Sequence, residues 1–238
     1  MEDKYLSIIT NFGCHYTCPY CIVKNNDIDI PITTIEGLDK LKEAVLKNKC
    51  NIVSISGGGD PARFLYKNLN WYKKLKDILE DLGVPMELHT SYIYPNQYEL
   101  TPAFNINGKE GVAFPYVEIP ESPYIMANRI VYHLHDIKDL VHVKRYKKNQ
   151  KIRVVFVVTD DMTKEDINFI AQFVKKSPDI DELSFRQRVD KNYQISYHLH
   201  DFLKEGHQKD WWYIEQADYN LYYAENRVST KYEDFKCH

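Results

Sequence analysis

Three cysteines lie close together near the start of the chain, in the segment NFGCHYTCPYC at residues 11–21. They are Cys14, Cys18 and Cys21, and their spacing is C-x3-C-x2-C. Thiolates at this spacing on one loop can ligate a metal ion or an iron–sulfur cluster. A [4Fe–4S] cluster has four irons, so three cysteines leave one iron open to a ligand from outside the protein. An open metal position is typical of a catalytic site.

A structural zinc site is the alternative, with His15 or a more distant residue as the fourth ligand. Zinc knuckles usually combine two close ligands with two more close ligands elsewhere in the chain. The remaining cysteines, Cys50 and Cys237, are isolated from each other and from the cluster. They are also too few to bind a second iron–sulfur cluster, so an auxiliary cluster is not expected.

A run of glycines is the second feature that suggests chemistry. Residues 54–61 read SISGGGDP, in which Gly57, Gly58 and Gly59 follow an apolar segment and precede Asp60. Glycine has no Cβ, so another group can approach the backbone closely at these positions. The segment has neither G-x-G-x-x-G spacing nor a following G-K-[ST], which disfavours a dinucleotide or phosphate loop.

Together the two motifs resemble the signature of the radical S-adenosylmethionine (SAM) superfamily. The cysteine motif has an aromatic residue, Tyr20, before its last cysteine, and Gly58-Gly59-Asp60-Pro61 is similar to the family's Gly-Gly-Glu-Pro motif, with aspartate in place of the commoner glutamate. The resemblance implies a [4Fe–4S] cluster on Cys14, Cys18 and Cys21, with the amino and carboxylate groups of SAM on the fourth iron. It implies further that one-electron reduction of SAM produces a 5′-deoxyadenosyl radical, which takes hydrogen from a substrate.

The resemblance also implies that strand ends line the SAM site. We expect Asp60 to supply negative charge near the SAM amine, and we expect cofactor contacts from Tyr20, Gly57, Gly58, Gly59, Asp60, Thr90, Ser91, His133 and Arg186. His133 and His135 alternate onto one face of a strand, as do Ser184, Arg186 and Arg188. The alternatives are histidines that are hydrogen-bonded inside a polar barrel and arginines that pair with buried carboxylates. No residue is assigned a catalytic role.

Strand-like and helix-like segments alternate along the chain and must position these residues. Hydrophobic patterning predicts strands at 5–10, 51–56, 86–93, 129–136, 152–159 and 182–189. It predicts helices at 34–47, 68–83 and 164–176, the last capped by Asp160 or Thr163. This order favours an α/β fold, a partial (β/α)6 TIM-like barrel of parallel strands with outer helices.

Two regions depart from the alternation. Residues 94–128 contain five prolines and little helical periodicity, which predicts a lid, a substrate loop or a small β insertion. The aromatic tail at 211–235 predicts an extra hairpin or a cap, although its side chains can equally belong to the core or stack on a ring of the substrate. We therefore expect a barrel core at 1–190 and a C-terminal extension at 191–238 that packs on it.

Composition limits the class of protein. The chain has 238 residues, 44% hydrophobic and 27% charged, with a formal net charge of −3, so nothing global indicates polyanion binding. There is no signal-peptide pattern and no apolar run of membrane length, and five cysteines with three in one cluster do not resemble a secreted disulfide framework. These features predict a cytoplasmic protein without a membrane partner. The basic segment 138–153 predicts a solvated helix face or a docking patch for phosphates or an acidic donor protein.

The sequence therefore favours a radical SAM enzyme that modifies or rearranges a small, nucleoside- or amino-acid-like substrate. The expected cofactors are a [4Fe–4S] cluster and SAM, and the expected partner is a flavodoxin- or ferredoxin-type electron donor. One alternative is a glycyl-radical-type activase that acts on a protein partner. The other is a non-catalytic zinc-binding module. The oligomeric state is not indicated.

Overall fold

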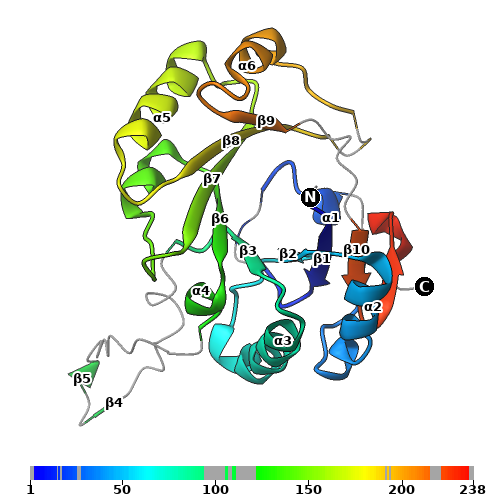
Figure 1. The fold of residues 1–238 in the computed structure, drawn as a ribbon. Coiled ribbons are helices and arrows are strands. Elements are labelled where there is room, and N and C mark those ends of the chain that lie inside the picture. Colours follow the sequence, from blue (N-terminus) through cyan, green and yellow to red (C-terminus); the bar gives the residue numbers. More distant parts are fainter. Residues whose placement is uncertain are drawn as a thin grey trace.

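The computed structural model describes residues 3–14, 16, 18–25, 28–93, 105–106, 109–110, 122–190, 192, 194–214 and 221–235. Within these residues a nine-stranded sheet runs in the order β11-β10-β1-β2-β3-β6-β7-β8-β9 (Figure 1). All neighbouring strands pair in parallel except β10 and β11, which are antiparallel. The fold is thus α/β with a mostly parallel sheet, as the alternation of elements predicts.

The six predicted strands are confirmed and are consecutive neighbours in the sheet. They are β1 (Tyr5–Thr10), β2 (Ile52–Gly57), β3 (Met86–Thr90), β6 (Arg129–Leu134), β7 (Lys151–Val158) and β8 (Glu182–Gln187). β3 ends three residues before its predicted end at residue 93, because the amides of Ser91 and Tyr92 donate to side chains, Asp60 Oδ2 and Thr90 Oγ1, instead of to a strand. β6 ends two residues before its predicted end because Asp136 caps the following 3-10 helix, η3 (Ile137–His142).

Two of the three predicted helices are confirmed, and the third is half correct. α3 (Leu69–Leu82) ends at Gly83, and α5 (Lys164–Lys176) is capped by Thr163 rather than Asp160, through a capping box with Asp166. The predicted helix at 34–47 is instead a short 3-10 turn, η1 (Glu36–Leu38), followed by α2 (Leu41–Asn48). The C-terminal extension causes this break, because Asn226 accepts a hydrogen bond from the Lys40 amide and donates one to the Glu36 carbonyl.

The shorter elements complete the described fold. They are α1 (Ile22–Asn25), η2 (Leu65–Asn68), α4 (Pro123–Met126), α6 (His200–Gly206), β9 (Trp212–Ile214), β10 (Leu221–Ala224), β11 (Arg227–Ser229) and η4 (Tyr232–Phe235). β4 (Asn105–Ile106) and β5 (Lys109–Glu110) form a separate antiparallel pair within the predicted insertion, most of which lies outside the described residues. No helix in the described part of the chain is long and apolar enough to span a membrane.

The predicted tail hairpin is β10–β11, and the tail also adds strands to both edges of the sheet. β9 pairs in parallel with β8 at one edge, and β10 pairs in parallel with β1 near the other. Residues 214 and 221 are seven peptide links apart, so their Cα atoms lie at most about 25 Å from each other. Seven strand spacings in a flat sheet would separate β9 from β10 by about 34 Å. The sheet must therefore curl, and it remains open, in agreement with a partial TIM-like barrel.

The two faces of the curled sheet differ in chemistry. Its outer face carries apolar residues such as Ile55, Leu88 and Val154, which belong to one core cluster with helix residues such as Leu75 and Ile167. Helices α2, α3, α5 and α6 lie outside the sheet (Figure 1). The alternate residues, which face inward, are largely polar or charged: Ser7, Ser54, Glu87, His89, Arg129, His133, Arg153, Glu182, Ser184 and Arg186. A polar interior is suited to binding a ligand rather than to stabilising a core.

Candidate functional site

The cysteine loop follows β1 at the carboxyl edge of the parallel strands, where open α/β sheets bind ligands. Cys14, Cys18 and Cys21 are free thiols, each half-buried. The amide of Cys21 donates to the carbonyl of Cys18 at 3.1 Å, and this turn leads into α1. Two side chains hold the loop: Lys24 Nζ donates to the Tyr16 carbonyl and Asn25 Nδ2 to the Pro19 carbonyl, both at 2.6 Å.

The glycine motif after β2 packs directly on the cysteine loop. The amide of Gly58 donates to the carbonyl of Thr10, and the amide of Asp60 donates to the carbonyl of Gly13, both at 2.8 Å. A Cβ on Gly59 would lie 2.2 Å from the Gly13 carbonyl oxygen. The sequence predicts that a group approaches these glycines closely, and at Gly59 the structure places the cysteine loop's own backbone in that position.

Asp60 joins the ends of β2 and β3. Its carboxylate accepts hydrogen bonds from Thr90 Oγ1 and the Ser91 amide, each at 2.7 Å, and from the Ala62 amide at 2.9 Å. Burial raises the pKa of Asp60, and these three hydrogen bonds act against that rise. Asp60, Thr90 and Ser91 therefore form one hydrogen-bonded unit beneath the cysteine loop, and their contact with a cofactor stays a prediction.

His135, rather than His133, is the histidine beside the cysteines. Its Nδ1 is 2.7 Å from the Tyr20 hydroxyl, and its Nε2 is 3.2 Å from Ser91 Oγ and 3.7 Å from Cys18 Sγ. Desolvation lowers the pKa of His135, which keeps the imidazole neutral near pH 7. Desolvation and the neighbouring Cys18 thiol raise the pKa of Tyr20, so its hydroxyl is protonated and can donate. The motif's aromatic residue thus joins the cysteine loop to the end of β6.

The charges of the three thiols favour a cationic partner. Desolvation raises the pKa of Cys18, and the nearby thiolates of Cys14 and Cys21 raise it further. Iron on these sulfurs would remove the repulsion, and an all-thiolate set is typical of iron–sulfur ligation. Among the described residues, which do not include His15, no three His, Cys, Asp or Glu side chains converge to hold a single metal ion. A cubane cluster makes a different demand, because each cysteine would bind a different iron, and three free thiols on one loop are the ligand type that such a cluster requires.

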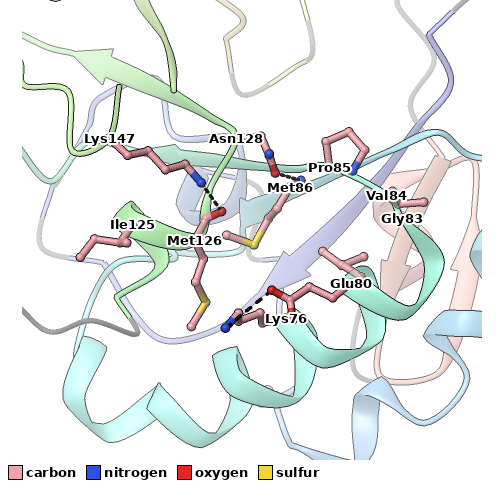
Figure 2. A pocket seen from close by; sticks show the side chains of 11 residues that line it. Lys76, Glu80, Gly83, Val84, Pro85, Met86, Ile125, Met126, Asn128 and Lys147 are labelled. Carbon is pink, nitrogen blue, oxygen red and sulfur yellow. Dashed lines mark hydrogen bonds and ion pairs between the residues drawn. The ribbon is translucent and has the colours of Figure 1, made fainter. Parts of the chain in front are cut away.

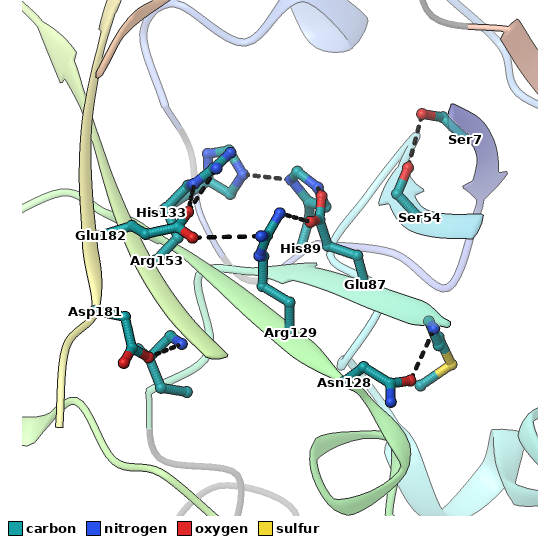
Figure 3. A network of polar contacts seen from close by, with 12 residues as sticks. Ser7, Ser54, Glu87, His89, Asn128, Arg129, His133, Arg153, Asp181 and Glu182 are labelled. Carbon is teal, nitrogen blue, oxygen red and sulfur yellow. Dashed lines mark hydrogen bonds and ion pairs between the residues drawn. The ribbon is translucent and has the colours of Figure 1, made fainter. Parts of the chain in front are cut away.

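A polar network crosses the interior of the barrel (Figure 3). His133 Nε2 lies 3.0 Å from His89 Nδ1, and His89 Nε2 lies 2.7 Å from Glu87 Oε1. The second oxygen of Glu87 accepts from Arg129 at 3.0 Å, and Glu182 accepts from both Arg129 and Arg153. The network starts at the amino half of the strands and ends at His133.

Charge in this network sets two protonation states. Burial alone would raise the pKa of Glu87, but the hydrogen bond and charge of His89, together with Arg129 and Arg153, lower it to about 2. Burial and the positive charges of His89 and Arg186 hold the pKa of His133 well below its usual value. Ionised Glu87 accepts a hydrogen bond from His89 Nε2, and His89 Nδ1 connects this pair to His133 Nε2. His133 is therefore neutral near pH 7.

β8 contributes the remaining predicted residues. Ser184 and Arg186 share its inner face, and within the described residues the fully buried Ser184 Oγ has no hydrogen-bond partner. Arg188 lies just beyond the strand, where it forms an ion pair of 2.5 Å with Asp160. The charge of Arg186 acts on His133, and Arg188 pairs with Asp160, a carboxylate that is 60% exposed rather than the buried one that the alternative expects.

Two surface pockets lie at opposite edges of the sheet. One of about 630 Å³ lies at the carboxyl edge, between Pro19 and Tyr20 of the cysteine loop and the segments after β7 and β8, including Asp160 and Arg188. The other, of about 460 Å³, lies at the amino edge between the end of α3 and α4 (Figure 2). The first adjoins the cysteine loop and is the candidate substrate entrance.

Sequence reasoning missed Glu87, His89 and the role of Gly13 as the packing partner of Gly59. The period of two along β3 was a usable signal for the first pair, because alternation puts Glu87 and His89 on the same face. Gly13 has a φ of +84°, which favours glycine, but this conformation has no signature in a single sequence.

No protein-family model matches the sequence, and no curated protein matches it. Among solved structures, the fold is similar to that of Streptococcus suis SuiB bound to the precursor peptide SuiA, with a TM-score of 0.53 and 19% sequence identity. The match covers 85% of this chain and 45% of the SuiB chain. At this identity the likeness establishes the fold, and the chain spans less than half the length of SuiB.

Proposed function

We propose that this protein is a radical SAM enzyme. The observation that carries the proposal is the three-cysteine loop directly after β1, bonded through Gly13 and Thr10 to the glycine motif after β2. The two motifs that resemble the superfamily signature are therefore in contact, at the carboxyl edge of a partial barrel. The likeness of the fold to SuiB supports the architecture that the resemblance implies.

In this proposal Cys14, Cys18 and Cys21 hold a [4Fe–4S] cluster whose fourth iron is left for SAM. When bound and reduced, that pair supplies a one-electron cleavage of SAM and a 5′-deoxyadenosyl radical that abstracts hydrogen from substrate. The chain's residues position the reactants: Asp60, Thr90 and Ser91 fix the strand ends beneath the loop, and Tyr20 and His135 fix its outer side. The remaining cofactor contacts that we propose are Gly57, Gly58, Gly59, His133 and Arg186.

The interior supports a polar substrate. His89 and Arg129 are each 25% exposed, although they lie on the inner face of the sheet, so solvent reaches this face. A small nucleoside- or amino-acid-like molecule suits such a chamber. A peptide is the second candidate, and the observation that favours it is the likeness to a protein bound to a precursor peptide. The imidazole of His133 and the charge of Arg186 suit polar groups of either substrate.

The test is anaerobic reconstitution with iron and sulfide, followed by reduction with dithionite in the presence of SAM. We expect a brown protein with about four irons that releases 5′-deoxyadenosine. Cys18→Ala should abolish both the iron and the product. Cys50→Ala is the matched control, because Cys50 is a buried core residue outside the loop, and this variant should retain both.

A colourless protein that binds zinc stoichiometrically and leaves SAM intact would refute the proposal in favour of the zinc module. Once SAM cleavage is established, small molecules and peptides can be screened for stimulation of 5′-deoxyadenosine release. A stable complex with a large protein and no small-molecule stimulation would instead support the activase alternative.

A further inference from the structure

We propose that an acidic flavodoxin-type electron donor docks on a cationic and aromatic surface beside the cysteine loop, formed by Arg63, Phe64 and Lys67 and called here the donor patch. The inference rests on the proposed function, whose chemistry consumes one electron for each SAM cleaved. A flavin donor supplies it by passing from the anionic hydroquinone to the neutral semiquinone, while the oxidised [4Fe–4S]2+ cluster becomes [4Fe–4S]1+. No proton is released in this step.

The donor patch lies against the residue that precedes the first cysteine. A Cβ placed on Gly13 would be 3.6 Å from both Cδ and Nε of Arg63 and 3.9 Å from the ring of Phe64. Gly13 is adjacent to Cys14 in the chain. A protein bound on Arg63 and Phe64 is therefore separated from a proposed cluster ligand by little more than one side chain.

Phe64 combines a large exposed aromatic side chain with an unfavourable backbone conformation. It is 40% exposed, and its backbone has φ 50° and ψ 42°, a left-handed conformation that costs an ordinary residue roughly 1–2 kcal/mol. Arg63 Cζ lies 4.5 Å and Lys67 Nζ 4.9 Å from the centre of its ring. The backbone thus holds an aromatic ring at the surface between two cations, and aromatic and arginine side chains are typical of interface centres.

The donor patch itself is positively charged. Residues 61–76 contain five lysines and arginines and no aspartate or glutamate; Lys74 and Lys76 pair with Asp39 and Glu80, whereas Arg63 and Lys67 lie against the Phe64 ring. The N-terminus of α3, which follows Lys67 closely, has no acidic residue in its first turn and no side-chain cap, so the helix dipole adds positive potential. The whole chain carries a net charge of −3, so this local positive region would orient an acidic partner that the rest of the surface does not attract.

The basic segment 138–153 is the rival docking surface, and its geometry is less suitable. Arg145 pairs with Asp181, Arg153 with Glu182, and Lys147 donates to the Met126 carbonyl. Lys144 and Lys148 are exposed, but Lys148 lies three residues before β7, at the amino edge of the sheet. A donor bound there would lie at the opposite edge from the cysteine loop.

The binding experiment measures the affinity of the reconstituted protein for a bacterial flavodoxin by calorimetry at low and moderate salt. Arg63→Glu with Lys67→Glu should weaken binding at least about tenfold, since like charges then face each other, and added salt should weaken wild-type binding. Phe64→Asn removes the ring but tolerates the left-handed backbone, so it should weaken binding without lowering the melting temperature. Lys144→Glu with Lys148→Glu is the matched control and should bind within about twofold of wild type.

The activity experiment separates this inference from the proposed function. With dithionite as reductant, the Arg63/Lys67 variant should release 5′-deoxyadenosine at the wild-type rate. With flavodoxin and its NADPH-dependent reductase, it should be slowed by about the factor seen in binding. Absence of product from the wild type with dithionite would refute the proposed function itself. Equal flavodoxin-driven rates in wild type and the Arg63/Lys67 variant, or a loss confined to the Lys144/Lys148 variant, would overturn the donor patch alone.

Discussion

Gly59 allows the glycine motif and the cysteine loop to touch, and a single methyl group tests that contact. In Gly59→Ala the new Cβ would lie 2.2 Å from the Gly13 carbonyl oxygen, a backbone atom that moves only if the loop moves. We expect the loop to be displaced at a cost of about 1–3 kcal/mol. Iron content after anaerobic reconstitution should fall well below that of wild type, while circular dichroism remains that of the folded chain.

Gly83→Ala is the control for a glycine substitution that does not affect the site. Gly83 ends α3 with a φ of +63°, and a Cβ there would have no neighbour within 4 Å. This variant should lose about 1–2 kcal/mol of stability from backbone strain but keep its iron. Wild-type iron content in Gly59→Ala would contradict the packing role that the structure gives to this glycine.

The sequence indicates which residues belong to the site, but it does not predict how their side chains are oriented. The cysteine spacing and the glycine run were recognisable as motifs because both are local. The orientation of Asp60 depends on Thr90 and Ser91, which are 30 and 31 residues away and become adjacent only once β3 pairs with β2. The same holds for His135, which reaches Tyr20 across a sequence separation of 115 residues.

At the scale of elements, the C-terminal hairpin shapes the start of α2. Asn226, in the turn between β10 and β11, bonds to the Lys40 amide and the Glu36 carbonyl, each at 2.8 Å, and has a φ of +63°. Asn226→Ala removes both hydrogen bonds, together with the one that Asn226 Oδ1 accepts from the Tyr223 hydroxyl, and strains the turn, so we expect a loss of about 2 kcal/mol in the free energy of unfolding in urea.

Asn226→Gly separates the two causes. Glycine is relaxed at positive φ, so this variant should recover part of the loss while the hydrogen bonds stay absent. If the alanine variant unfolds at the wild-type urea concentration, the hairpin does not stabilise this region.

Element prediction succeeded where patterns are long and failed where pairing is distant. The apolar run of β7 and the amphipathic helices α3 and α5 carry their own periodicity, so the sequence predicts them nearly to the residue. β9 and β11 have three residues each, too few to show a period. They form because each pairs with a strand at an edge of the sheet, β9 with β8 and β11 with β10. The break between η1 and α2 has the same origin, since its cause lies about 190 residues away.

The whole molecule is a curled sheet with an apolar outside under helices and a polar inside. The parallel order and the barrel class followed from the alternation of strands and helices. The sequence predicts the polar interior only in part. A strand covered on both faces is usually a continuous apolar run, and β7 is such a run apart from Arg153, so its pattern does not indicate which face is polar. Glu87, Arg129, Arg153 and Glu182 together join four neighbouring strands, β3, β6, β7 and β8, near the amino edge.

This network predicts a pH dependence of global stability. Glu87 is 5% exposed, and its pKa is lowered to about 2 from an ordinary value of 4.5, so the unfolded chain binds its proton more readily than the folded one. The stabilisation is fully present above about pH 4.5 and is lost as the pH falls toward about 2, and it amounts to about 3 kcal/mol. Urea unfolding between pH 6 and pH 3 should show it as a loss of stability on acidification.

Glu87→Gln isolates this contribution from that of the other carboxylates. The variant keeps the shape of the side chain but cannot ionise, so it should be less stable than wild type at pH 6, and the difference should shrink on acidification. Each pH should be compared between the two proteins at equal salt, since the ion pairs are partly screened. Parallel curves for wild type and variant would mean that Glu87 stays protonated or exchanges its partners. Glu87, His89 and His133 would then not form a fixed series of hydrogen bonds inside the barrel.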